Sequence, residues 1–156
     1  MSNCILYVED EEADIFLLRH AFKKAGLSAV SLQAVSDGET AIRYLSGAGQ
    51  YSNRQEYPLP ALVLLDLKMP GTSGLDVLAW IRQQPHLCAL VVITLSSSAN
   101  PADVRRAYEL GANSFIEKPS GTEQTIRLAQ ALNNWWLEQN RFAPPTDPRH
   151  SLDHAA

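Results

Sequence analysis

The sequence predicts an α/β fold, in which helices cover both faces of a doubly wound parallel sheet of five strands in the order 2-1-3-4-5. Apolar runs of strand length alternate along the chain with longer segments of helical periodicity, which is typical of repeated strand–helix units. Three runs are almost entirely hydrophobic, as expected for central strands, whereas two are alternating or very short, as expected for edge strands. The predicted central strands are 4–8, 61–65 and 90–93, and the predicted edge strands are 30–35 and 114–116.

Helical segments follow these strands, and four of them carry readable start signals. A side-chain oxygen before a helix, with an acid three residues later, can satisfy backbone N–H groups that have no partner within the helix. Gly26 and Gly111 are expected to stop the first and fourth helices. The predicted helices are 11–25, 38–46, 74–84, 101–110 and 122–139. The predicted capping pairs are Ser36 with Glu39, Ser73 with Asp76, Asn100 with Asp103, and Ser120 with Glu123.

Length and composition narrow the class of protein. The 156 residues, 46% of them hydrophobic, suit one globular domain with a real core. Because 13 Lys and Arg face 17 Asp and Glu, there is no basic surplus for binding nucleic acid, and no apolar run approaches the roughly 20 residues of a membrane span. Cys4 and Cys88 have apolar neighbours and no metal-ligand spacing, so both are expected to be buried thiols in a reducing cytoplasm.

Two segments fall outside the predicted strands and helices. The connection at 47–60 is longer than usual for this kind of fold, which makes it a candidate recognition loop. Residues 140–156 contain three prolines and few apolar side chains, and we expect an extended arm without an output domain. The domain itself is therefore expected to span residues 1–139.

Acidic residues follow two of the predicted central strands. Glu9 and Asp10 come directly after the first strand, and Asp66 comes directly after the third. Parallel strands place these ends at one edge of the sheet about 5 Å apart, so the carboxylates should repel one another unless a cation binds them. Oxygen ligands that leave room for water suit Mg²⁺. The alternative is an acidic first helical turn that only complements the helix dipole, and Lys118 after the last strand could be a solvated surface charge.

Taken in order, these residues resemble the receiver domain of two-component response regulators over about residues 3–139. The resemblance rests on the pair Glu9-Asp10, the segment 66–71 (Asp-Leu-Lys-Met-Pro-Gly), the hydroxyl of Ser96 and the pair Lys118-Pro119. Each of these elements alone is weak evidence for the family. Each stands at a strand end, however, and the whole set in this order is specific to receiver domains. The resemblance implies a flavodoxin-like fold and a phosphoprotein of a two-component phosphorelay.

The resemblance also implies the chemistry of the site. Asp66 would accept a phosphoryl group from a histidine kinase, and Lys118, the invariant lysine of the family, would offset charge on the transferring oxygens. Glu9, Asp10 and Asp66 would hold Mg²⁺ together with the backbone carbonyl of Lys68. Glu9 stands where Asp is frequent in the family, and we expect this longer side chain to reach the metal through water.

Two further residues take switch roles in the resemblance. Ser96 would be the switch hydroxyl that contacts the new phosphoryl group, and Phe115 would be the switch aromatic that turns inward. The output would then be a population shift at the surface of the fourth helix, fifth strand and fifth helix. From the residues alone, an ordinary core aromatic explains Phe115 equally well, and an exposed loop hydroxyl explains Ser96. The Lys118–Pro119 bond is expected to be cis, as is usual in the family.

The aromatic end of the last predicted helix suggests a partner surface. Trp135 and Trp136 point about 100° apart on a helix, so one of them should meet solvent or a partner, and Phe142 follows in the arm. With the long loop, these features resemble the stand-alone response regulators associated with phytochromes. That resemblance implies a homodimer and a phytochrome-type histidine kinase as phosphodonor.

Three other interpretations compete with a phosphorylated receiver. A phosphohydrolase of the haloacid-dehalogenase type also forms an aspartyl phosphate, but it needs a second Asp where this chain has Lys68. A flavodoxin-like cofactor binder needs a phosphate-cradling loop, and the acids at 9–12 would repel the phosphate. A receiver that works as an adaptor without phosphorylation remains open, although Asp10, Asp66 and Lys118 are all present.

Overall fold

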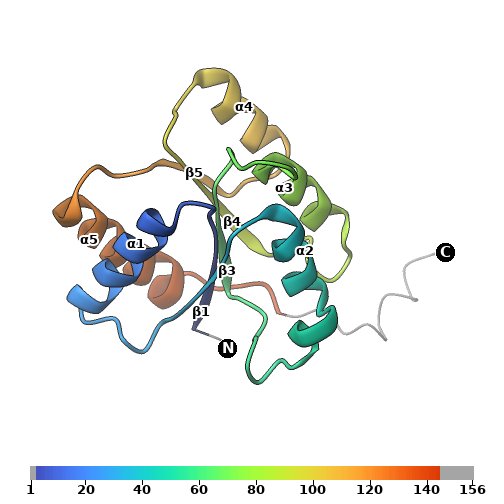
Figure 1. Cartoon of the computed structure of the whole chain (residues 1–156), viewed down its shortest axis with the longest axis horizontal. Coiled ribbons are helices and arrows are strands. Elements are labelled where there is room, and N and C mark those ends of the chain that lie inside the picture. Colours follow the sequence, from blue (N-terminus) through green and yellow to red (C-terminus); the bar gives the residue numbers. More distant parts are fainter. Residues whose placement is uncertain (1–2, 145–156) are drawn as a thin grey trace.

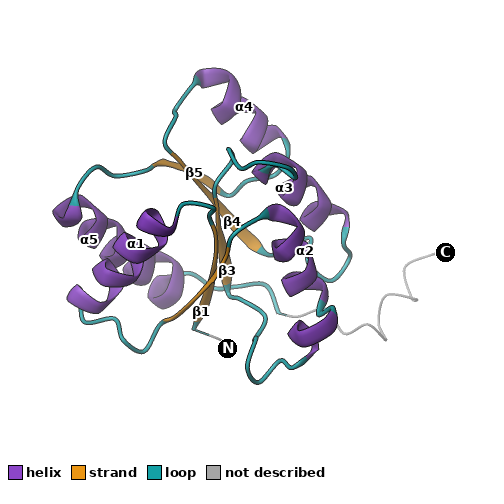
Figure 2. Cartoon of the chain, in the orientation of Figure 1, coloured by secondary structure: helices purple, strands orange, loops and turns teal. Residues whose placement is uncertain are grey.

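A computed structural model describes residues 3–144, which form a single parallel sheet with helices packed on both faces (Figure 1; Figure 2). The strand order is β2-β1-β3-β4-β5, as predicted. The strands are β1 (Cys4–Val8), β2 (Ser31–Val35), β3 (Leu62–Leu65), β4 (Val91–Ser96) and β5 (Ser114–Glu117).

The burial of each strand follows its hydrophobicity. Every residue of β1, β3 and β4 is buried, whereas β2 and β5 are mostly half-buried or exposed. All four strand pairs are parallel, and the register sets Val8 beside Leu65. The prediction of three central and two edge strands is therefore confirmed, and the ends of β1 and β3 are side by side.

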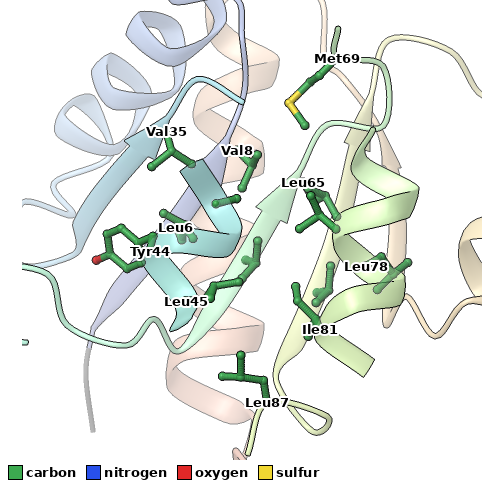
Figure 3. Close-up of a cluster of buried hydrophobic side chains, with 14 of the residues drawn as sticks. Leu6, Val8, Val35, Tyr44, Leu45, Leu65, Met69, Leu78, Ile81 and Leu87 are labelled. Atoms are coloured by element: carbon green, nitrogen blue, oxygen red, sulfur yellow. The ribbon is translucent and has the colours of Figure 1, made fainter. Parts of the chain in front are cut away.

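Two layers of helices complete the fold. Helices α1 and α5 cover one face of the sheet, and α2, α3 and α4 cover the other (Figure 1). Figure 3 shows the second layer, where Tyr44 of α2 and Ile81 of α3 pack over strand residues such as Leu6 and Leu65. The helices are α1 (Glu12–Lys24), α2 (Gly38–Ser46), η1 (Gly49–Ser52), α3 (Gly74–Gln83), α4 (Pro101–Glu109), α5 (Thr122–Ala131) and η2 (Leu132–Gln139).

The helix starts agree with the predicted ranges, but not every cap is the predicted one. The side chain of Ser73 and that of Asp76 form the expected reciprocal capping box. Helix α2 is capped by Asp37, which accepts a hydrogen bond from the Thr40 amide, so Ser36 is not its cap. Helix α5 begins after Gly121, without a side-chain cap from Ser120. Because several cap candidates stand next to one another, the backbone path decides which oxygen reaches the helix.

The last predicted helix changes its winding near the middle. From Leu132 onward it is the π-helix η2, whose wider turn brings Asn133 and Glu138, five residues apart, within 2.8 Å. Trp136 packs against the core, and Trp135 remains 64% exposed. The expectation that one tryptophan faces outward is thus confirmed.

The long connection before β3 folds back onto helix α2. Arg54 donates hydrogen bonds to the carbonyls of Tyr44 and Leu45 at the end of the helix, and the rings of Tyr51 and Tyr57 lie against that of Tyr44. This packing gives the connection a structural role at the end of α2.

The two cysteines differ in burial. Cys4 is buried in β1, as expected, but Cys88 is exposed in the turn before β4, so that prediction was wrong. The apolar neighbours of Cys88 belong to a turn at the surface rather than to a strand. Among residues 3–144, no helix is both long enough and apolar enough to cross a membrane.

Candidate functional site

Three carboxylates converge where β1 and β3 end. Glu9 and Asp10 follow β1, Asp66 follows β3, and one oxygen from each lies within 4.8 Å of the others. The parallel pairing of Val8 with Leu65 brings these residues together, because it aligns the two strand ends. The structure thus brings together the three acids that the sequence predicted.

Asp66 is held firmly at this edge. Its side chain is buried, and its Oδ1 accepts a hydrogen bond of 3.2 Å from the backbone amide of Lys68. Its other oxygen, Oδ2, lies 3.3 Å from the ammonium of Lys118. The ammonium of Lys68 lies 3.6 Å from Asp103 Oδ2 on α4.

Glu9 is the most buried of the three acids, with no exposed surface. Its Oε1 accepts a hydrogen bond of 3.1 Å from the Glu11 amide, and its Oε2 accepts one from the hydroxyl of Tyr7 and pairs with Lys118. Burial raises the pKa of Glu9 to about 7, although the hydrogen bonds from Lys118 and Glu11 lower it. Both oxygens of Glu9 already have protein donors in the folded chain.

Lys118 is the centre of the site. Its Nζ contacts Glu9, lies 3.0 Å from Asp14 Oδ2 and 3.3 Å from Asp66 Oδ2, and its side chain is 13% exposed. Burial lowers the pKa of Lys118, but the hydrogen bonds to Glu9 and Asp14, together with the negative charges of Asp66 and Glu9, outweigh it, so the pKa lies above its ordinary value. The Lys118–Pro119 bond is trans, so the expectation of a cis bond was wrong.

Ser96 and Phe115 stand beside this cluster. Ser96 is buried at the end of β4, and its backbone carbonyl accepts a 2.8 Å hydrogen bond from the Lys118 amide. It is therefore not an exposed loop hydroxyl. Phe115 is half-buried in β5, and its backbone amide donates to the hydroxyl of Tyr108 on α4. Ser96 of β4 thus contacts Lys118, and Phe115 of the neighbouring strand β5 contacts α4.

Sequence reasoning missed two residues of the site. Tyr7 lies two positions before Glu9 in the strand direction, so both side chains point to the same face of the sheet, a signal that period-two alternation carries. Asp14 stands in the first turn of α1, the helix that covers this face, where an acid is also explained by the helix dipole. Its contact with Lys118 spans 104 positions, and only the fold reveals it.

The donor set fits a hard divalent cation. Glu9, Asp14 and Asp66 contact the ammonium of Lys118, and Asp10 lies beside Glu9 and Asp66, so the described site carries an excess of negative charge. Carboxylate and carbonyl oxygens are the ligands that Mg²⁺ and Mn²⁺ prefer. Glu9, Asp10 and Asp66 could therefore hold such an ion, while Asp14 and Lys118 form an ion pair next to it.

The three residues predicted for a partner surface are not equivalent. Trp135 is exposed on η2, whereas Trp136 and Phe142 pack against the core layer of α1 and α5. Phe142 also lines an apolar pocket of about 240 Å³ with Leu59 and Cys88. Of the three, only Trp135 presents most of its ring to solvent.

Comparisons with known proteins identify the family. Residues 5–130 match the family "Response regulator receiver domain". The chain is 36% identical to the response regulator Rcp1 of Synechocystis sp. over 86% of its own length and 88% of that protein, and 35% identical to the probable methanogenesis regulatory protein FilR2 of Methanothrix harundinacea over 90% and 88%.

Solved structures agree with the sequence matches. The phosphorylated cyanobacterial phytochrome response regulator RcpA is 33% identical, with a TM-score of 0.82 over 92% of this chain and all of that chain. The Mn²⁺-bound form of Rcp1 has a TM-score of 0.75 at 33% identity, over 90% of this chain and 99% of that one. The acidic cluster, the fold and these relatives agree, and the chain belongs to the response regulator receiver domain family.

Proposed function

We propose that this chain is a cytoplasmic response regulator of a two-component phosphorelay that accepts a phosphoryl group from a histidine kinase on Asp66. The observation that carries the proposal is the setting of Asp66: a buried carboxylate between a backbone amide and the Lys118 ammonium, beside two further acids. An oxygen of Asp66 attacks phosphorus, the bond from phosphorus to the donor breaks, and the donor leaves with the electron pair of that bond. The product is an acyl phosphate.

The residues around Asp66 have separate roles in this step. Glu9, Asp10 and Asp66, with the backbone carbonyl of Lys68, would hold Mg²⁺, which supplies positive charge to the transferring oxygens when bound. Lys118 supplies a second positive charge, and it already points at Asp66 Oδ2 before the reaction. Because the transition state of phosphoryl transfer is stabilised mainly by position and charge, these contacts supply most of the catalysis.

The signal would pass from the acyl phosphate to the surface of α4, β5 and α5. The buried hydroxyl of Ser96 stands at the end of β4, where it can donate to a phosphoryl oxygen, and Phe115 lies on the neighbouring strand. Inward movement of Ser96 would favour an inward position of Phe115 and a different packing of α4. The protein would then shift between two populations rather than turn over a separate substrate.

We propose a phytochrome-type histidine kinase as the donor. The support is the similarity to Rcp1 and to RcpA, which is described as a phytochrome response regulator. FilR2, a probable methanogenesis regulator, is nearly as similar in sequence, so the donor has to be identified by phosphotransfer rather than by similarity.

We further propose that the receiver domain spans residues 1–139 and that residues 140–156 form an arm, of which 145–156 lie outside the described residues. A homodimer through the last helix and this arm would bury the exposed ring of Trp135. Trp136 and Phe142, packed beneath, would support that surface from within each chain.

Intact mass spectrometry tests the central proposal. After incubation with acetyl phosphate and Mg²⁺, the parent should gain the mass of one phosphoryl group, because Asp66 is its nucleophile. Asp66→Asn keeps the shape of the side chain but removes the nucleophilic carboxylate, so it should gain nothing. An unmodified parent would instead support the adaptor interpretation, and equal labelling of Asp66→Asn would place the phosphoryl group elsewhere.

The same readout tests the donor. Transfer from a phosphorylated phytochrome-type kinase should be faster than transfer from an unrelated histidine kinase at the same concentration. Equal rates from both kinases would contradict the phytochrome assignment while leaving Asp66 as the acceptor.

A further inference from the structure

The ammonium of Lys118 has as many carboxylate partners as it has N–H groups. Its Nζ contacts Glu9 Oε2, Asp14 Oδ2 at 3.0 Å and Asp66 Oδ2 at 3.3 Å. An ammonium has three donors, so each carboxylate can accept one of them. Glu9 and Asp66 belong to the acidic cluster already described, whereas Asp14 lies outside it on helix α1.

We propose that Asp14 is a positioning residue for Lys118, which holds the ammonium at the phosphoryl-acceptor carboxylate before and after transfer. This inference rests on the proposed function of Asp66. Lysine carries its charge on a flexible stem of four carbons, so its head group needs external contacts to stay in one place. Asp14 provides such a contact from the first turn of a helix, which is a rigid support.

The three hydrogen bonds of Lys118 should change differently during phosphoryl transfer. When Asp66 becomes an acyl phosphate, the N–H that pointed at its Oδ2 is free to donate to a phosphoryl oxygen. The N–H groups on Glu9 and Asp14 need not change partner, so they keep the ammonium in place throughout the step. If Glu9 turns toward a bound metal, Asp14 becomes the remaining carboxylate anchor among the contacts of the described chain.

Loss of the Asp14 contact should therefore slow the reaction without removing the nucleophile. The Lys118 side chain is only 13% exposed, so little water is available to replace the lost acceptor. A hydrogen bond to a charged group of this kind is expected to change the rate by about tenfold. A residue that acted only through its charge would give a different pattern, because its neutral isostere would have the same effect as its deletion.

Three variants separate these possibilities. Asp14→Ala removes the acceptor and the charge, and Asp14→Asn removes the charge but keeps an acceptor oxygen. Glu12→Gln removes one negative charge from the same helical turn and is the matched control, since Glu12 is exposed and has no ion pair among the described residues. The measurement is the rate of phosphorylation at increasing acetyl phosphate concentrations up to saturation, with Mg²⁺ saturating throughout.

We expect Asp14→Ala to react about tenfold more slowly than the parent, and Asp14→Asn and Glu12→Gln to stay within about twofold of it. The loss should appear in the rate at saturation rather than in the donor concentration for half-maximal rate. A parent-like rate in Asp14→Ala, or an equal loss in Asp14→Ala and Asp14→Asn, would overturn the positioning role.

A second readout does not depend on phosphorylation. In the metal-free protein, the NMR signal of the Lys118 ammonium, assigned by its loss in Lys118→Gln, should be protected from solvent exchange in the parent and in Asp14→Asn. It should be lost in Asp14→Ala, and equal exchange in parent and Asp14→Ala would refute the inference. If the parent accepts no phosphoryl group, the proposed function fails, but the ammonium signal still reports on Asp14.

Discussion

At the scale of single residues, the half-buried cations Lys118 and Arg82 bind oxygen atoms of different kinds in different parts of the molecule. Lys118 lies among carboxylates at the site, whereas Arg82 on α3 donates, within residues 3–144, only to neutral oxygens. The Arg82 guanidinium reaches the carbonyls of Gly111 and Leu90, each at 2.7 Å, and the Asn113 side chain at 3.0 Å. These contacts tie the end of α3 to the turns that precede β4 and β5, and burial lowers the pKa of Arg82.

Replacement of Arg82 should therefore destabilise the fold. Arg82→Leu leaves the carbonyls of Gly111 and Leu90 without their donors, so we expect the free energy of unfolding to fall by about 2–3 kcal/mol in urea denaturation. Arg82→Lys should recover only a minor part, because one ammonium cannot span the same acceptors.

The matched control is Arg106→Leu. Arg106 is exposed, and in the part of the chain that the structure describes its one ion pair is with Glu109 at 3.7 Å, so its loss should cost less than about 0.5 kcal/mol. Equal losses of unfolding free energy in the two arginine variants would show that the hydrogen bonds of Arg82 to neutral oxygens do not add to stability.

At the scale of elements, helix α2 shows how a cap is chosen by the backbone. Ser36 and Asp37 are adjacent and both can cap a helix, but the structure uses Asp37, whose Oδ1 lies 2.7 Å from the Thr40 amide. This hydrogen bond lowers the pKa of Asp37 below its ordinary value of 3.8. A lowered pKa in the folded state means that the cap stabilises the fold above the unfolded pKa and that this contribution is lost as the pH falls through the folded one.

The loss of stability caused by Asp37→Ala should consequently depend on pH, and it should be larger at neutral than at acidic pH. At pH 7 the variant should be about 1 kcal/mol less stable than the parent. The difference should begin to shrink below about pH 4, where the unfolded chain becomes protonated at Asp37, and it should be lost as the pH falls through the lower pKa of the folded state. Urea denaturation at several pH values measures both quantities.

Two control variants accompany this experiment. Asp37→Asn should keep most of the stability at every pH, since Asn caps as well as Asp, and Ser36→Ala should change little at pH 7. A loss in Asp37→Ala that is the same at pH 7 and pH 3 would contradict the carboxylate cap.

At the scale of the whole molecule, the proposed phosphoryl-acceptor site and the proposed dimer surface lie toward opposite ends of the strands. The carboxylates follow the ends of β1 and β3, whereas α5 runs back across the sheet and ends with η2 near the start of β1 (Figure 1). Asp66 contacts Lys118, and Lys118 also contacts Asp14 in the first turn of α1. The packing of α1 against α5, which forms one of the two core layers, provides a continuous connection.

The dimer proposal predicts a specific role for Trp135. In sedimentation velocity, the parent should form a dimer, and Trp135→Ala should weaken its association by about tenfold or more, because large aromatic side chains dominate many interfaces. Phe16→Ala is the matched control, since Phe16 is 69% exposed on α1, outside the proposed surface. A monomeric parent, with and without phosphorylation, would contradict the proposal.

Strand order could be predicted because hydrophobicity reports how many faces of a strand are covered. Helices on both faces make β1, β3 and β4 almost wholly apolar, and this property is local in the sequence. The convergence of Glu9, Asp10 and Asp66 then follows from parallel pairing alone. The cap of α2 and the winding of η2 could not be predicted in this way, because adjacent candidates compete and packing selects among them.

The sequence by itself determined the layered sheet, the edge at which the acids meet and the family to which they point, since all three depend on residues at strand ends. Only the tertiary structure decided how Lys118 is held. Asp14 reaches Lys118 from α1, 104 positions away in the chain, because helix packing brings the first turn of α1 to the edge of the sheet where β5 ends. Contacts between residues so distant in the chain depend on the packing of whole elements, which no local pattern encodes.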